Sequence, residues 1–207
     1  MCKKTVIAIG REFGSGGRAI ARRLSEMMGI PMYDKELIQM TAQKSGYSEE
    51  VLHDIDETAS NSLLYSLSLY PNQNINFMMN GKVLPLGEKA HIICSGIIKE
   101  LAEKESCIIV GRCADSILRD NENLLTVFIH CDMERRIDRV AEFQKCSRNE
   151  AANMIKKADR KRSAYHNYYA DTKWGSRDAY DLCIDSRIGF ETAAELIKTA
   201  AENLQKK

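Results

Sequence analysis

A glycine-rich turn directly after a short apolar run constrains the fold of this chain more than any other feature. Residues 5–9 are apolar and partly β-branched, which predicts a buried strand. Residues 10–17 then read Gly-Arg-Glu-Phe-Gly-Ser-Gly-Gly, and a helical pattern with Ile20 and Leu24 on one face follows them. A strand, a glycine-rich turn and a helix in this order place backbone N–H groups and the positive end of a helix dipole around an anion. This turn is therefore predicted to bind phosphate.

The end of the turn departs from the usual phosphate-binding loop. That loop continues with Gly-Lys-Ser/Thr, where the lysine reaches the β and γ phosphates and the hydroxyl helps to hold magnesium. Here Gly17 stands at the lysine position, Arg18 and Ala19 follow it, and the nearby hydroxyl belongs to Ser15. We expect Arg18 to replace the lysine, with Arg11 as the second candidate, because a guanidinium can bind two phosphate oxygens. Either arginine could instead form a surface salt bridge.

The backbone of the turn is the second part of the predicted site. Successive N–H groups in a glycine-rich loop can surround the phosphates of a nucleotide. We expect this cradle to be formed by Gly14, Ser15, Gly16 and Gly17. The alternative interpretation is a strand–helix turn whose glycines only allow tight packing.

Strand-like and helical patterns alternate along the rest of the chain. Further strands are predicted at residues 31–33, 107–110, 124–130 and 180–185. Helices are predicted at residues 35–44, 48–57, 89–104, 132–146, 148–169 (as one helix or a pair) and 191–204. This alternation predicts an α/β fold in which a parallel sheet is flanked by helices on both faces.

The length of 207 residues suits a single domain. We divide it into a core (1–33, 88–131 and 178–207), an inserted and mostly helical lobe (34–87) and a basic helical region (132–177). Residues 34–60 carry seven acids and two bases, whereas residues 133–177 carry twelve bases and six acids. A basic region beside a phosphate site suits phosphoryl transfer, although a solvated helix surface would have the same composition.

Other features argue against several classes of protein. The net charge is +1 and no nucleic-acid-binding motif is present, so we expect no nucleic-acid partner. No apolar run approaches the ~20 residues that span a bilayer. The seven cysteines show neither C-x-x-C pairs nor zinc spacing, and no signal-peptide pattern precedes them, so we expect free thiols, a cytoplasmic location and no certain metal ligand. Leu63 to Tyr70 could pack inside the lobe or against a second copy in a homodimer.

Four motifs, in this order along the chain, carry a resemblance to a known family. They are residues 10–18, 33–38 (Tyr-Asp-Lys-Glu-Leu-Ile), 109–115 (Ile-Val-Gly-Arg-Cys-Ala-Asp), and 174–175 with 180–186. From about residue 5 to residue 200 the chain resembles the cytidylate kinase-like family, in which Gly-Gly-Arg commonly stands in place of Gly-Lys-Gly. The resemblance implies a three-layer P-loop fold of the nucleoside-monophosphate kinase type. It also implies binding of ATP and Mg²⁺ and phosphoryl transfer to a nucleotide acceptor, CMP or dCMP above others.

The resemblance further implies roles for residues outside the turn. Arg112 resembles the arginine of a Gly-Arg-Asp motif, which implies contact with the acceptor phosphate. The aspartate of that motif falls at Cys113, so Asp115 is a candidate acceptor ligand that departs from the strict pattern. Asp159 and Arg162 resemble the Asp-x-x-Arg of the kinase lid, which implies that Arg162 contacts phosphate during transfer.

Three further candidates come from position alone. Asp34 ends the second predicted strand, where it could position the acceptor or a magnesium-bound water, or could cap the next helix. Arg136 and Arg160 lie in the basic region and join Arg162 as lid candidates that would close over ATP and exclude water. Four aromatic residues could stack on a base, although core packing is the favoured interpretation: Tyr165, Tyr168, Tyr169 and Trp174.

The altered loop leaves two other functions open. The glycine at position 17 removes the usual lysine. The chain could therefore be a nucleotide sensor that binds without transfer, or a kinase that acts on an acceptor other than a nucleotide.

Overall fold

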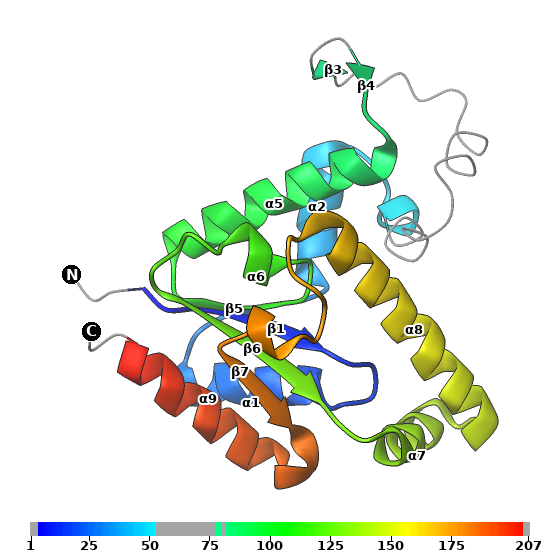
Figure 1. The fold of residues 1–207 in the computed structure, drawn as a ribbon. Coiled ribbons are helices and arrows are strands. Elements are labelled where there is room, and N and C mark those ends of the chain that lie inside the picture. Colours follow the sequence, from blue (N-terminus) through cyan, green and yellow to red (C-terminus); the bar gives the residue numbers. More distant parts are fainter. Residues whose placement is uncertain (1–3, 53–77, 80–81, 205–207) are drawn as a thin grey trace.

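The computed structural model describes residues 4–52, 78–79 and 82–204, and its centre is a five-stranded parallel sheet (Figure 1). The strands are β1 (Val6–Arg11), β2 (Met32–Tyr33), β5 (Cys107–Val110), β6 (Leu124–His130) and β7 (Leu182–Asp185). Their order in the sheet is β2-β5-β1-β6-β7, so that β1 lies in the middle with β5 and β6 hydrogen-bonded to it. The predicted bounds of β5 and β6 are confirmed, and β7 begins two residues later than predicted.

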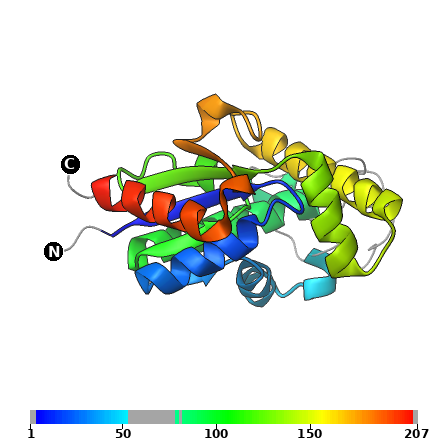
Figure 2. The same cartoon turned by 90° about the horizontal axis from the view of Figure 1, so that it is seen from below.

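Helices cover both faces of the sheet and give three layers (Figures 1 and 2). One face is covered by α1 (Gly17–Met28) and α9 (Phe190–Leu204), and the other by α5 (Leu86–Lys104) and the short α6 (Ala114–Ile117). Further elements are α2 (Glu36–Ser45), α7 (Met133–Gln144), α8 (Arg148–Tyr169) and the 3₁₀ turns η1 (Arg177–Ala179) and η2 (Ser186–Ile188). The predicted α/β fold is thus confirmed. Within the described residues, no helix is both long and apolar enough to cross a membrane.

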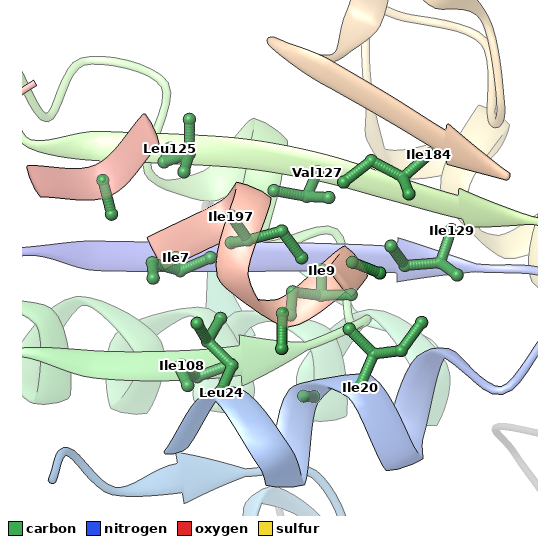
Figure 3. Close-up of a cluster of buried hydrophobic side chains, with 14 of the residues drawn as sticks. Ile7, Ile9, Ile20, Leu24, Ile108, Leu125, Val127, Ile129, Ile184 and Ile197 are labelled. Carbon is green, nitrogen blue, oxygen red and sulfur yellow. The ribbon is translucent and has the colours of Figure 1, made fainter. Parts of the chain in front are cut away.

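The core is divided by the alternation of side chains along β1. Ile7 and Ile9 point to the face that α1 and α9 cover, whereas Val6 and Ala8 point to the face that α5 covers. Figure 3 shows Ile7 and Ile9 in the first of these clusters, with Ile197 of α9 lying across them. Because β1 is buried on both faces, it reads as a continuous apolar run, as central parallel strands do.

The lobe at residues 34–87 is only partly described. Its helix α2 packs on α5, and the structure adds an antiparallel pair that we did not predict, β3 (Met78–Met79) with β4 (Lys82–Val83). The helix predicted at 48–57 begins after Ser48, whose hydroxyl accepts a hydrogen bond from the N–H of Val51. Its end, like the segment from Leu63 to Tyr70, lies outside the described residues.

Both helices of the basic region begin at a residue whose side chain caps the helix. The carboxylate of Asp132 accepts a backbone hydrogen bond at the start of α7, and Ser147 and Glu150 form a capping box at the start of α8. α8 then continues without a break, so the second half of the region is one long helix rather than a pair. α7 and α8 pack together through an apolar cluster that contains Ile155 and touches Phe13 of the glycine-rich loop.

Neighbouring residues of α9 give a matched test of the packing. Ile197 is fully buried, whereas half of Leu196 is exposed to solvent. We expect Ile197→Ala to lower the free energy of unfolding by about 2–5 kcal/mol, because it leaves a cavity against the sheet. Leu196→Ala should cost less than about 1 kcal/mol. Urea denaturation followed by circular dichroism measures both, and similar losses for the two variants would contradict this packing of α9.

Candidate active site

The glycine-rich loop joins β1 to α1 and is packed tightly from behind. Gly14 and Gly16 have φ angles of 77° and 84°, in the left-handed region that side chains disfavour. A Cβ atom on Gly14 would lie 2.9 Å from Cγ2 of Val140, and one on Gly16 would collide with the ring of Phe190. These glycines therefore serve both the backbone conformation and the close contact with α7 and α9.

Three arginines of α7 and α8 donate hydrogen bonds to the carbonyl groups of the loop. The two helices lie beside the carboxyl end of β1 (Figure 1). Arg139 Nη1 donates hydrogen bonds to the carbonyls of Gly14 (3.3 Å) and Ser15 (3.1 Å). Arg136 Nε donates to the carbonyl of Phe13 (2.9 Å), and Arg162 Nη1 to that of Arg11 (3.1 Å).

This arrangement sets the direction of the peptide groups. In a trans peptide the C=O and the next N–H point in opposite directions. Because the carbonyls of residues 13 and 15 are bound by arginines on one side, the N–H groups of Gly14 and Gly16 point to the other side. The loop thus has donors available on the side where the N-terminus of α1 adds its positive dipole, which suits an anion.

A buried charge network anchors the same loop. The Arg136 side chain is 4% exposed and lies between the carboxylates of Glu12 and Asp159. Its Nη1 is 2.9 Å from Oε2 of Glu12, and its Nη2 pairs with Oδ2 of Asp159. Asp159 Oδ1 also accepts the N–H of Phe13 at 2.7 Å, and Glu12 Oε2 accepts the N–H of Cys131 at 3.0 Å. All three guanidinium nitrogens of Arg136 are therefore engaged in holding the loop, and Asp159 acts on the loop backbone.

An open cleft of about 1770 Å³ extends from the loop along the carboxyl ends of the strands. Most of the predicted site residues line it: Arg11, Gly14, Gly16, Gly17, Arg18, Asp34, Arg112, Asp115 and Arg162. Four others do not: Ser15, Arg136, Asp159 and Arg160. Arg160 is exposed on α8, and Ser15 is fully buried, where its hydroxyl donates to the carbonyl of Glu12 and accepts the N–H of Gly17.

Asp34 joins the two arginines that were candidates for the missing lysine. Its Oδ1 lies 3.3 Å from Arg11 Nη2 and its Oδ2 lies 2.8 Å from Arg18 Nε. The interpretation of Asp34 as a helix cap is wrong, because α2 begins after Lys35 and has no side-chain cap bond. Two guanidinium groups around one carboxylate form a cationic site that could accept phosphate oxygens in its place.

A left-handed turn at the end of β5 positions Arg112. Gly111, Arg112 and Cys113 have φ angles of 80°, 58° and 56°, and such conformations in residues other than glycine are concentrated at functional sites. Arg112 lines the cleft and also a smaller hollow between α2 and α5. It thus lies between two adjoining hollows.

The wall of the cleft contains a pair that sequence reasoning missed. Asp115 Oδ2 lies 2.8 Å from His166 Nε2, and both side chains are buried. Tyr180 lies close by, and burial raises the pKa of its hydroxyl. Asp115 and His166 look unrelated in the sequence, because nothing local connects a residue of α6 with one of α8.

The tyrosines of α8 pack mainly against one another and against α5. The ring of His91 stacks on that of Tyr169 at 3.7 Å between centroids, and His91 Nδ1 lies 2.9 Å from the hydroxyl of Tyr165. Tyr168 is largely exposed, and Trp174 packs edge-on against Phe128 while lining the cleft. Packing thus accounts for His91 and Tyr169. Burial lowers the pKa of His91 to about 4.

In the described part of the chain, no group of three or more histidine, cysteine, aspartate or glutamate side chains is arranged to hold a metal ion.

Comparisons with solved structures define the class of fold. The chain is similar to a shikimate kinase from Bacteroides thetaiotaomicron (12% identity, 96% of this chain and 98% of that one, TM-score 0.55). It is also similar to a gluconokinase from Sinorhizobium meliloti (11% identity, 98% and 97%, TM-score 0.51). With the glycine-rich loop and the cleft at the strand ends, these similarities establish a P-loop kinase fold.

The family is narrower than the fold. The model of the cytidylate kinase-like family matches residues 6–188, and the chain belongs to that family. It is also 34% identical to an uncharacterized protein from Eubacterium ventriosum whose structure is solved, over 96% of this chain and 99% of that one, with a TM-score of 0.70. No curated protein matches the chain. Family and fold together support a phosphotransferase.

Adjacent arginines of α7 test the buried network. Arg136→Ala should lower the free energy of unfolding by about 3–5 kcal/mol, because it leaves two carboxylates without their cation. Arg135→Ala should cost less than about 1 kcal/mol, because Arg135 is exposed and its ion pair is with Asp132, the exposed N-cap of the same helix. Denaturant unfolding measures both variants. Equal stability of the two would show that the network does not hold the loop.

The pH dependence of stability follows from His91. Its pKa in the folded protein, about 4, lies below its ordinary value of 6.5, so the unfolded chain binds the proton first as the pH falls. The contribution of neutral His91 to the free energy of unfolding is therefore fully present above pH 6.5. It is lost as the pH falls from 6.5 to 4, by at most about 3 kcal/mol. His91→Gln should flatten the fall of unfolding free energy over this interval. An unchanged slope would contradict the prediction.

Proposed function

We propose that the protein transfers the γ-phosphoryl group of ATP to a nucleoside monophosphate, with CMP or dCMP as the acceptor. The observation that carries this proposal is the position of Arg112, which lines both the large cleft at the glycine-rich loop and the smaller hollow between α2 and α5. An arginine between two adjoining hollows can bind the phosphate of an acceptor opposite the end of a donor triphosphate.

The donor side is supported by the loop. The N–H groups of Gly14 and Gly16 and the N-terminus of α1 would bind the triphosphate of ATP. Arg11, Arg18 and Arg162 line the same cleft and would neutralise its charge. Phosphoryl transfer needs alignment and positive charge over the equatorial oxygens more than covalent help, and this cleft is rich in such charge. Magnesium, bound with the nucleotide, would neutralise charge between the β and γ phosphates.

The acceptor side is supported by the residues that line the smaller hollow. It is lined mostly by apolar groups of α2 and α5, with Thr41, His91, Arg112 and Tyr165 as polar members. A nucleotide could place its phosphate on Arg112 and its base among these side chains. A monophosphate oxygen is already ionised near neutral pH, so it can attack without a general base, and the cleft needs only to position it.

One observation favours a second candidate, a kinase that phosphorylates a hydroxyl group. The Asp115–His166 pair lies in the cleft wall beside Arg112. A carboxylate hydrogen-bonded to an imidazole is suited to remove a proton from an alcohol, a step that a phosphate acceptor does not require. A sensor that binds nucleotide without transfer is the third candidate, because position 17 lacks the lysine.

An acceptor panel distinguishes the three. The purified protein is incubated with ATP, magnesium and one acceptor at a time, either a nucleoside monophosphate or a small polyol or hydroxy acid, and ADP is measured against a control without acceptor. We expect CMP or dCMP to stimulate turnover. Stimulation only by a hydroxyl compound would favour the second candidate, and ATP binding without stimulation would favour the sensor.

Substitution of Arg112 tests the role of the residue itself. Arg112→Ala should lower kcat/KM for the acceptor by about 100-fold, since it removes a charged contact to the acceptor phosphate. Arg22→Ala, on the exposed face of α1, is the matched control and should leave activity unchanged. Similar activity of the two variants would show that Arg112 does not bind the acceptor.

A further inference from the structure

The side chain of Arg11 occupies the space that a side chain at position 17 would need. A Cβ atom built on Gly17 would lie 2.7 Å from Cβ and 3.2 Å from Cγ of Arg11. The φ angle of Gly17 is not in the left-handed region, so the backbone does not demand glycine here. Glycine is favoured here because the Arg11 side chain passes over it, and Cβ of Ile129 would also lie close, at 3.3 Å.

A second glycine makes room for the other end of the same side chain. A Cβ atom on Gly111, at the end of β5, would collide with Nη1 of Arg11. The Arg11 side chain thus runs to Asp34 through a channel that Gly17 borders at its stem and Gly111 at its guanidinium. The side chain is 19% exposed, whereas that of Arg18 is 44% exposed, so Arg11 is the more firmly positioned of the two.

The loop sequence links the same two positions, 11 and 17. The usual loop reads Gly-x-x-x-x-Gly-Lys, with its first glycine six positions before its lysine. When its second glycine is aligned with Gly16, the first falls on Arg11 and the lysine on Gly17. Relative to the usual loop, the cation and the glycine have therefore exchanged places. The exchange agrees with the contact between the two positions, because only one of them has room for a long side chain.

We propose that Arg11 supplies the charge that the lysine supplies in the usual loop, reaching the donor phosphates through the channel between Gly17 and Gly111. Asp34 holds its guanidinium until a phosphate group replaces the carboxylate. This inference rests on the proposed function for the identity of the ligand, while the steric exchange rests on the structure alone. It assigns the lysine's role to Arg11 rather than to Arg18, which the sequence favoured.

A reciprocal substitution tests the exchange in two ways. The first is stability without ligand, measured as the midpoint of thermal unfolding. Gly17→Lys should lower the midpoint, because its side chain meets Arg11, and adding Arg11→Gly should restore it towards that of Arg11→Gly alone. Equal effects of Gly17→Lys in both backgrounds would overturn the steric part of the proposal.

The second is the affinity for ATP with magnesium, measured by calorimetry. Arg11→Gly should weaken binding by about 10- to 100-fold, the expected loss of a charge-assisted contact. The double variant Arg11→Gly/Gly17→Lys should recover most of that loss, whereas Arg18→Ala should weaken binding only a few-fold. A large effect of Arg18→Ala together with a small effect of Arg11→Gly would overturn the assignment.

The two proposals fail in different ways. If the wild-type protein binds no nucleoside triphosphate, the proposed function and the phosphate role of Arg11 both fall, while the unfolding midpoints still decide the steric exchange. If the wild type binds ATP and Arg11→Gly binds it equally well, only the assignment of Arg11 falls.

Discussion

The guanidinium of Arg136 lies buried between two carboxylates, and the shape of the candidate site depends on this pairing. A buried cation is tolerated only when opposite charges and hydrogen-bond acceptors surround it. Glu12 and Asp159 meet this need, and each also binds a backbone N–H group, of Cys131 and Phe13 respectively. One cation thus fixes the loop after β1, the start of α7 and the middle of α8 relative to one another. The base of the basic region cannot swing away as a lid without unpairing this charge.

The layers of the fold were predictable because their signals are local. β5 and β6 read as short apolar runs, as expected of parallel strands buried on both faces. The predicted starts of α7 and α8 lie within one residue of the observed ones, where the side chains of Asp132 and Ser147 cap the helices. The place of Arg112 followed from topology, since the carboxyl ends of parallel strands share one edge of the sheet.

Contacts between distant residues were not predictable, because nothing in the local sequence records them. Asp115 and His166 are 51 positions apart in the sequence, and the tertiary fold brings them together. Arg136 looks like Arg135 within a basic stretch, yet one is buried and the other exposed. The sequence could identify cations near the loop, but it could not separate those that hold the loop from those that face the cleft. Asp34 could have capped the next helix by its position in the sequence, but its carboxylate instead pairs with Arg11 and Arg18.

The contact between Arg11 and Gly17 also limits how such a loop can evolve. Positions 11 and 17 share one channel, so a change at either is conditional on the residue at the other. A lineage that moved between the two arrangements by single substitutions would pass through a chain with two crowded cations or with none. The intermediate with two glycines avoids the crowding and loses the charge, which makes it the accessible route. Related loops should therefore show correlated residues at these positions, and a cation at both should be rare.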